Sequence, residues 1–148
     1  MIFIQVIKLI IDNDTVNRYN EHYFQKYPYR KKAPITSPIH PSLNVWTKLK
    51  NEEMNILKQQ WGDFTKWFIQ DFGLTNKKIE HCMIEVVNYF KDQRVRDLDN
   101  VTIKFYQDGF VESGFIVADD YKHVQKLTLS GGYDKNHCRT EFFITYDY

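Results

Sequence analysis

The stretch Arg96-Asp97-Leu98-Asp99-Asn100 stands at a predicted change of secondary structure, and the segment from Val101 to Ser113 follows it, with Gly114 next. Asparagine is favoured at helix N-caps, and glycine is typical of the position directly after a helix. We therefore predict a helix over 101–113, begun by Asn100 and closed by Gly114. If the chain before Asp97 is extended, Asp97 and Asp99 project to one face, because side chains alternate in direction along a strand.

Predicted strands surround this stretch. Each is a run rich in β-branched and aromatic residues between turn signals. They run from Ile2 to Ile11, from about Ile79 to Phe90, from His123 to Leu129 and from Arg139 to Tyr146. In the second strand, alternation predicts that Cys82, Ile84 and Val86 share one face. The last two strands are joined across Gly131-Gly132 and the turn Asp134-Lys135-Asn136, which contain residues typical of turns.

The longest helical pattern runs from Ser42 to about Phe72. Its large apolar residues recur at three- and four-residue steps, which is typical of a helix with one apolar face. They are Trp46, Leu49, Leu57, Trp61, Phe64 and Phe68. This stripe faces either the core or a second subunit, and Gly62 is a candidate break between two helices. The segment before it, from Asn17 to Pro41, contains all four prolines and is predicted to be a loop region.

Together these elements predict an α+β fold. It has a mixed, mostly antiparallel sheet of about four strands, a long helical segment and a short helix that carries candidate catalytic residues. The 148 residues, 43% of them hydrophobic, are close to the ~150 expected per domain, so we expect a single domain over 1–148. No apolar run reaches membrane-spanning length, and the first six residues lack the charged region of a secretion signal. We therefore expect no membrane partner and a cytoplasmic location.

The formal net charge is +1, so any binding of nucleic acid must come from local patches. One such patch is predicted between Tyr23 and Lys32, where tyrosines are interleaved with basic side chains that suit phosphates and exposed bases. Its candidate DNA-binding residues are Arg30, Lys31 and Lys32. A solvated loop whose tyrosines pack on the domain is an equal alternative. Arg94 and Arg96 flank the aspartates and are predicted to contact phosphates.

The carboxylates of this region indicate a metal site. Asp97, Asp99 and the pair Asp119-Asp120 lie close in sequence to Lys104. A cluster of carboxylates without histidine or cysteine favours Mg²⁺ or Mn²⁺ over Zn²⁺. A helix that begins here would also attract a phosphate. The alternative is that Asp97, Asp99 and Asn100 only cap a helix.

Two histidine-cysteine pairs, His81-Cys82 and His137-Cys138, raise the separate alternative of a zinc site. Neighbouring residues on a strand face opposite ways, so at most one ligand from each pair could reach a common ion. We expect buried free thiols in strands instead.

The order of these features resembles the RusA family of Holliday-junction resolvases. The similarity lies in the pattern R-D-x-D-N at 96–100, in a helix with an early lysine and a central aspartate, and in a glycine, an aspartate pair and two terminal strands after it. The residues concerned are Lys104, Asp108, Gly114, Asp119 and Asp120. Asn17-Arg18-Tyr19 is also similar to an asparagine-arginine-tyrosine signature found in part of that family. The resemblance is sharpest over 94–146.

The resemblance implies a homodimeric, magnesium-dependent endodeoxyribonuclease, with Mn²⁺ as a substitute ion, that acts in DNA recombination and repair. Such an enzyme nicks a four-way (Holliday) DNA junction at two symmetric positions and leaves 5′-phosphate ends. The resemblance implies that Asp97, Asp99 and Asp120 bind the metal and that Lys104 is the catalytic lysine. Arg18 and Asn100 are further candidate DNA contacts. Because the family is frequent in bacteriophage genomes, a phage origin would be consistent with it.

Two other interpretations use the same residues. The run from Asp97 to Val101 fits the nucleophile motif of haloacid-dehalogenase-type phosphatases, but polar residues 93–96 precede it, where that motif needs a buried apolar strand. The stronger alternative is a RusA-like protein that binds branched DNA, or serves as a structural partner, without cutting it.

Overall fold

The computed structural model describes residues 4–147 of the chain, and it contains a four-stranded sheet with strand order β1-β4-β2-β3. The strands are β1 (Ile4–Asp12), β2 (Cys82–Phe90), β3 (Val124–Tyr133) and β4 (Arg139–Asp147). β4 pairs antiparallel with both β1 and β2, and β2 pairs parallel with β3. The predicted α+β fold with a mixed, mostly antiparallel sheet is therefore confirmed. Ile2 and Phe3, at the start of the predicted first strand, lie outside the described residues.

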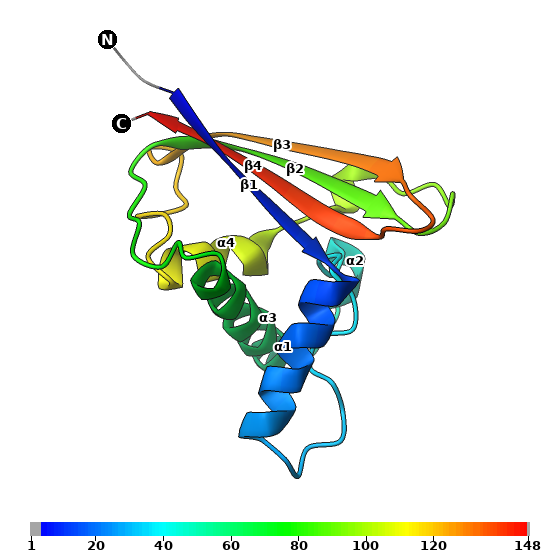
Figure 1. Cartoon of the computed structure of the whole chain (residues 1–148). Coiled ribbons are helices and arrows are strands. Elements are labelled where there is room, and N and C mark those ends of the chain that lie inside the picture. Colours follow the sequence, from blue (N-terminus) through cyan, green and yellow to red (C-terminus); the bar gives the residue numbers. More distant parts are fainter. Residues whose placement is uncertain (1–3, 148) are drawn as a thin grey trace.

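The helices cover a single face of this sheet (Figure 1). They are α1 (Asn13–Lys26), α2 (Leu43–Trp46), α3 (Asn51–Asp71) and α4 (Lys104–Glu112), and a 3-10 turn, η1 (Leu98–Asn100), precedes α4. In β2, Cys82, Ile84 and Val86 are buried on the covered face, as the alternation predicted. Met83 and Glu85 are exposed on the open face.

The connection from β2 to β3 decides which end of the sheet each motif reaches. Parallel neighbours need a crossover, and here η1 and α4 form it. Cys82 pairs with Val124 and Phe90 pairs with Tyr133, so both strands begin at the same end of the sheet. The loop that leaves β2 and the turn that enters β3 consequently lie at opposite ends. β3 and β4 are not neighbours, because β2 lies between them.

The first helix was not expected from the sequence. Residues 13–26 form α1, so the prediction of a loop region from Asn17 was wrong over this part. The Asp12 carboxylate accepts the N–H of Thr15 at 3.0 Å, and Thr15 Oγ1 accepts the N–H of Asp12 at 3.3 Å. This reciprocal pair is a capping box, which fixes where the helix begins. Val16 and Tyr19 then bury the inner face of α1.

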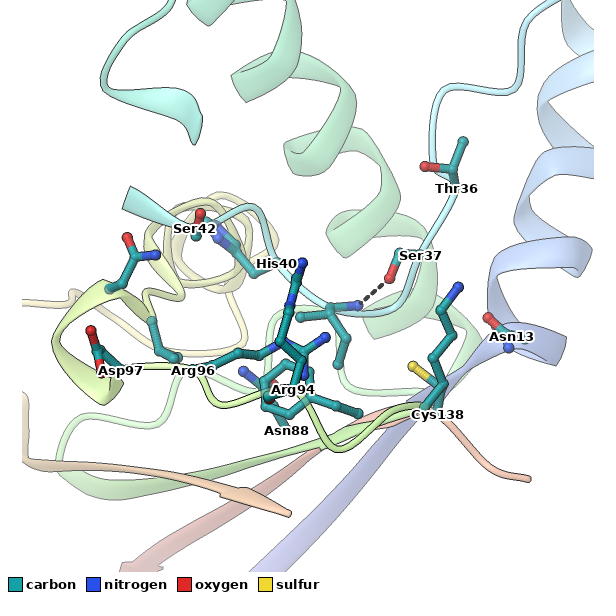
Figure 2. Close-up of a pocket in the computed structure, with 15 residues that line it drawn as sticks. Asn13, Thr36, Ser37, His40, Ser42, Asn88, Arg94, Arg96, Asp97 and Cys138 are labelled. Carbon is teal, nitrogen blue, oxygen red and sulfur yellow. Dashed lines mark hydrogen bonds between the residues drawn. The ribbon is translucent and has the colours of Figure 1, made fainter. Parts of the chain in front are cut away.

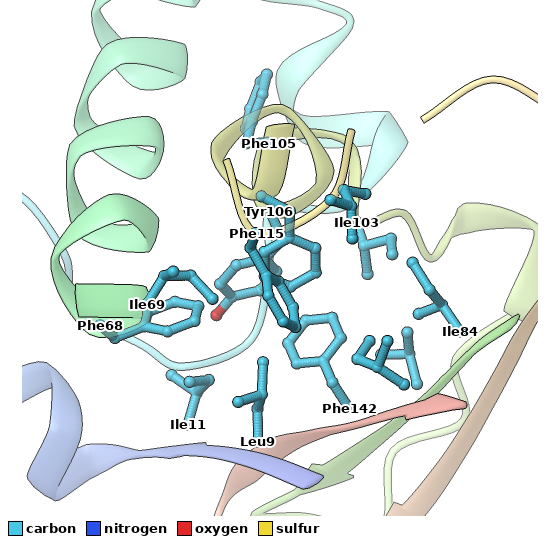
Figure 3. Packing of buried hydrophobic residues seen from close by; sticks show 14 of the residues in the cluster. Leu9, Ile11, Phe68, Ile69, Ile84, Ile103, Phe105, Tyr106, Phe115 and Phe142 are labelled. Carbon is cyan, nitrogen blue, oxygen red and sulfur yellow. The ribbon is translucent and has the colours of Figure 1, made fainter. Parts of the chain in front are cut away.

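The predicted helical segment from Ser42 to Phe72 is present, but its break lies elsewhere. The chain leaves helical geometry between Trp46 and Asn51, whereas Gly62 is buried within α3. Trp61, Phe64 and Phe68 are at most 4% exposed and contact the ring of Tyr106 in α4. The Tyr106 ring in turn packs against Phe142 of β4 (Figure 3). The apolar stripe therefore belongs to the core. The alternative that the stripe faces a second subunit is excluded for these three residues, because they are buried within the chain.

The short helix begins later than predicted and ends where predicted. α4 starts at Lys104, and Asn100 lies in η1, where its Oδ1 accepts the N–H of Asn44 at 2.8 Å instead of capping α4. Gly114 has φ +73°. The N–H groups of Gly114 and Phe115 donate to Val111 and Phe110, both at 3.0 Å, which is a Schellman motif closed by a C′ glycine.

Candidate functional site

A cavity of about 420 Å³ opens at the end of the sheet where β2 finishes and β4 begins. Four segments line it: the first residue of α1, the loop before α2, the segment from the end of β2 through η1 to Val101, and the residue before β4. Figure 2 shows side chains from these segments, including Asn13, His40, Asn88 and Arg94, arranged around the same hollow. Ligand sites are commonly concave pockets of this size range with a few convergent polar groups, so the cavity is the candidate site.

The cavity has a positive lining. Lys91, Arg94 and Arg96 contribute cations, and Asp97 is its carboxylate. Four residues that the sequence predicted as functional, Arg94, Arg96, Asp97 and Asn100, all line this one cavity. The short motif around 94–100 therefore forms a common surface with segments that are distant in the sequence.

Arg96 is held in place by its neighbours. Its Nη1 donates to Asp92 Oδ1 and to the carbonyl of Arg94, both at 2.9 Å, and its guanidinium lies 4.1 Å from the centroid of the Phe90 ring. The hydrogen bond from Arg96 also lowers the pKa of Asp92, which keeps this carboxylate ionised. The side chain of Arg94 is exposed and makes no ion pair with another described residue. Arg94 is consequently the arginine best placed to bind a phosphate, and Arg96 supports the loop that carries it.

The wall of the cavity that the loop before α2 forms is fixed to the core. The carbonyl of Pro38 accepts the hydroxyl of Tyr106 at 2.6 Å and that of Thr140 at 2.8 Å. His40 Nδ1 lies 2.7 Å from the carbonyl of Pro41, and His40 Nε2 accepts the N–H of Phe105 at 2.9 Å. Burial lowers the pKa of His40 to about 4, so the ring is neutral with the proton on Nδ1. The loop before α2 is therefore tied to the start of α4.

The three predicted metal ligands are not brought together within this chain. Asp97 lines the cavity, and Asp99 is exposed in η1, where the alternation expected for an extended strand does not apply. Asp120 precedes β3 at the other end of the sheet. β2 has nine residues, which at the usual rise per residue separate the two ends by roughly 25 Å. Over residues 4–147, no group of three or more histidine, cysteine, aspartate or glutamate side chains is arranged to hold a metal ion.

Asp120 has different partners. Its Oδ1 accepts the N–H groups of Lys122 and His123, at 3.0 and 3.2 Å, and lies 2.7 Å from His123 Nδ1. The hydrogen bond with the His123 ring lowers the pKa of Asp120. The expected set of Asp97, Asp99 and Asp120 thus does not fit one metal ion in a single chain.

The remaining predicted residues lie outside the cavity. Lys104 is the first residue of α4, exposed, with its Nζ 3.8 Å from Asp108 Oδ2. Arg18 bridges α1 and α3, because it donates to Asp14 at 3.2 Å and to Asp71 at 3.0 Å. Arg30, Lys31 and Lys32 are exposed on the loop after α1, which lies on the far side of the helices from the sheet (Figure 1).

The zinc alternative is excluded for the two histidine-cysteine pairs. Cys82 is buried at the start of β2, and Cys138 precedes β4 near the end of β2. His137 lies beside Asp12, 2.9 Å from its Oδ2. The expected buried thiol in a strand is confirmed for Cys82, whereas Cys138 is only partly buried and lies outside β4.

Sequence reasoning missed several residues of the cavity. Lys91 continues the charged segment after β2, and Asn88 is a polar residue on the inner face of an otherwise apolar strand. The alternation along β2 could have identified Asn88, because it places this polar residue on the inner face. Asn13 and His40 carried no such signal, because only the tertiary fold brings their segments to β2.

No known protein-family model matches the chain, and a search of curated proteins finds no match. The resemblance to the RusA family therefore rests on the motif residues themselves. Among the described residues, no helix is both long enough and apolar enough to cross a membrane.

Proposed function

We propose that the cavity binds the phosphate backbone of DNA and that the chain is a RusA-like, metal-dependent endodeoxyribonuclease that resolves four-way junctions. Such resolution consists of paired symmetric nicks that leave 5′-phosphate ends. The observation that carries the proposal is the common cavity of Arg94, Arg96 and Asp97, with Lys91 beside them. A concave site with three cations and one carboxylate suits an anionic ligand that also meets a metal.

In this proposal, Arg94 and Lys91 bind phosphate oxygens, and Arg96 holds the loop in position through Asp92. Phosphate contacts of this kind fix the register of DNA on the protein. Asn100 supports the same loop from the other side, through its bond to the N–H of Asn44.

The proposed metal site has two carboxylates, Asp97 and Asp99, whereas the sequence suggested three. Mg²⁺ is commonly bound through one or two carboxylates, several waters and the substrate phosphate. Asp97, directly before η1, and Asp99, within η1, are both exposed and are the carboxylates that would meet a Mg²⁺ or Mn²⁺ ion arriving with DNA. Such an ion would polarise the phosphate and lower the pKa of a bound water. Lys104, the first residue of α4, remains the candidate catalytic lysine.

A second candidate is a RusA-like protein that binds branched DNA without cutting it. The position of Asp120 favours it, because one of the three implied ligands is at the other end of the sheet and already bonded to His123.

The proposal includes a homodimer, since two symmetric nicks need two sites related by a twofold axis. The enzyme would act in the cytoplasm of a bacterial or phage-infected cell, where it meets branched DNA.

The test is cleavage of a labelled synthetic four-way junction, with a linear duplex of the same sequence as the substrate control, in Mg²⁺, Mn²⁺ or EDTA. Paired, symmetric, metal-dependent nicks are expected from the wild type. Asp99→Asn should retain less than about a tenth of the cleavage rate, because a carboxylate that meets the metal is lost. Junction binding, measured by gel shift in EDTA, should be unchanged or tighter, because a negative charge near phosphates is removed.

Asp120→Asn is the matched variant. We expect it to cut within about threefold of the wild-type rate. A loss as large as that of Asp99→Asn would show that Asp120 completes the metal site in the assembled enzyme. Junction binding without nicks in either metal would favour the non-catalytic candidate, and neither binding nor cutting would overturn both.

A further inference from the structure

Two histidines lie side by side at the end of the sheet opposite the cavity. His81 and His123 immediately precede β2 and β3, and the pairing of Cys82 with Val124 places them next to each other across the parallel strands. Their rings are nearly parallel, with an interplanar angle of 15° and centroids 6.0 Å apart. Neither ring is used by the cavity or by the proposed cleavage.

The hydrogen bonds of the two rings fix the tautomer of each. His81 Nδ1 lies 3.0 Å from the carbonyl oxygen of Lys122, which only accepts, so this nitrogen carries the proton. His123 Nδ1 lies 2.7 Å from Asp120 Oδ1, an ionised carboxylate that also only accepts. In the neutral form, both rings therefore leave the lone pair of Nε2 free.

The Nδ1 partners of both rings are of the kind found behind histidine ligands in protein metal sites. A histidine ligand almost always donates its second ring N–H to a carboxylate or a backbone carbonyl, which orients the ring and raises its basicity. Here the partner of His123 is a carboxylate, and the partner of His81 is a backbone carbonyl. His81 is exposed, and the side chain of His123 is 27% exposed, so an ion has access from solvent.

The distance between the rings is also compatible with a shared ion. Two imidazoles bound at 2.0–2.1 Å to a tetrahedral ion have centroids about 5 Å apart. The observed 6.0 Å exceeds this value by about 1 Å, so the two rings have to move closer together when they share an ion.

We propose that His81 and His123 form a second site, which binds a divalent transition-metal ion such as Zn²⁺ through their Nε2 atoms, with water in the remaining positions. Asp120 is the positioning residue of this site, because it holds the His123 ring, and it is not a ligand of the Asp97 site. Imidazole ligands favour zinc, copper and nickel, whereas magnesium prefers oxygen. Because two protein ligands leave the ion open to solvent, the site is exchangeable, unlike a closed structural zinc site.

The experiment is titration of the full chain with ZnCl₂ by isothermal calorimetry at pH 7.5, with side-chain ¹⁵N spectra of the histidines recorded in parallel. The Nε2 resonances of His81 and His123 should shift together on binding. His81→Ala and His123→Ala should each weaken zinc affinity at least tenfold, and Asp120→Asn should weaken it by about 10- to 100-fold. His22→Ala is the control, because His22 is an exposed histidine on α1, and its affinity should equal that of the wild type. Ten millimolar MgCl₂ should not displace the zinc.

His81→Gln and His123→Gln, with circular dichroism of each variant, separate loss of a ligand from loss of structure. A folded glutamine variant that binds zinc like the wild type would overturn the proposal. So would an unchanged Nε2 resonance at saturating zinc. The outcome is independent of DNA cleavage, so it stands or falls apart from the proposed function.

Discussion

At the scale of single residues, His40 connects a loop of the cavity to the core. Its ring accepts the N–H of Phe105 at the start of α4 and is bonded through Nδ1 to the carbonyl of Pro41. A protonated ring could not accept from Phe105, because both of its nitrogens would then be donors. The folded state therefore requires neutral His40, and burial lowers its pKa from 6.5 to about 4.

This shift predicts a pH dependence of stability. Above pH 6.5 the ring is neutral in both states. Between pH 6.5 and 4 the unfolded chain takes up a proton that folded His40 does not, so the free energy of unfolding falls by up to about 3 kcal/mol. Urea unfolding at a series of pH values measures this loss. His40→Gln, whose amide oxygen can still accept from Phe105, should lose stability more slowly over this interval.

His22→Ala is the control, since His22 is exposed on α1, and it should keep the wild-type pH dependence. The carboxylates of Asp12, Asp92, Asp120 and Asp134 also have lowered pKa values, and the stability that they contribute begins to be lost at about pH 5 and is lost further as the pH falls below 3.8. The effect of His40 is therefore measured between pH 6.5 and about 5. Parallel curves for the wild type and His40→Gln would show that His40 is not the group responsible.

At the scale of elements, α3 and α4 each contain a glycine that faces the other helix, and the two glycines differ in how close that neighbouring helix lies. Gly109 of α4 lies against Thr65 of α3, and a methyl group added there would overlap the Thr65 side chain. Gly62 of α3 is also buried in a helix, but an added methyl group would only touch Glu112, at 3.7 Å. Thr65 is itself fully buried and bonded to the carbonyl of Trp61, so it has no room to move.

We predict opposite results for the two alanine variants. Gly109→Ala should lower the free energy of unfolding by about 1–3 kcal/mol, because it overpacks the contact between α3 and α4. Gly62→Ala should leave it unchanged or raise it by up to about 1 kcal/mol, because alanine favours a helix more than glycine does. Urea unfolding of both variants is the measurement. Equal stability of the two would contradict the close approach at Gly109.

The elements that the sequence predicted well are those with local signals. Alternation in β2, the apolar stripe of α3 and the glycine after α4 each depend on near neighbours, and each is present. α1 was missed because its tyrosines and Lys26 suggested a nucleic-acid loop, although the capping box from Asp12 to Thr15 was a readable helix start. The break at 47–50 has no glycine or proline to mark it.

At the scale of the whole molecule, the strand order separates residues that are close in sequence. Asp97 and Asp120 lie on either side of the crossover, and because β3 runs parallel to β2, the chain returns across the full sheet before Asp120. The local part of the site, Arg94 to Asn100, was therefore predictable, whereas the position of Asp120 depends on a strand pairing that no short motif encodes. The same crossover brings His123 beside His81.

The two ends of the sheet also predict where DNA binds, if the proposed function holds. Arg94 and Lys91 belong to the cavity end, whereas Lys77 lies near Tyr146 at the opposite end, its Nζ 5.4 Å from the ring centroid. Each lysine or arginine that neutralises a phosphate contributes about 0.9 to the slope of log affinity against log salt on duplex DNA. Arg94→Gln and Lys91→Gln should each weaken junction binding and reduce this slope by about one.

Lys77→Gln removes the same charge from the other end and is the matched control. Its affinity and its salt slope should equal those of the wild type when junction binding is measured by fluorescence anisotropy from 50 to 200 mM NaCl in EDTA. The absence of divalent metal keeps binding separate from cleavage. Equal losses for Lys77→Gln and Arg94→Gln would mean that DNA senses only the net charge of the chain. A loss confined to Arg94→Gln and Lys91→Gln would place the DNA at the cavity, because the three variants have the same net charge and differ only in position.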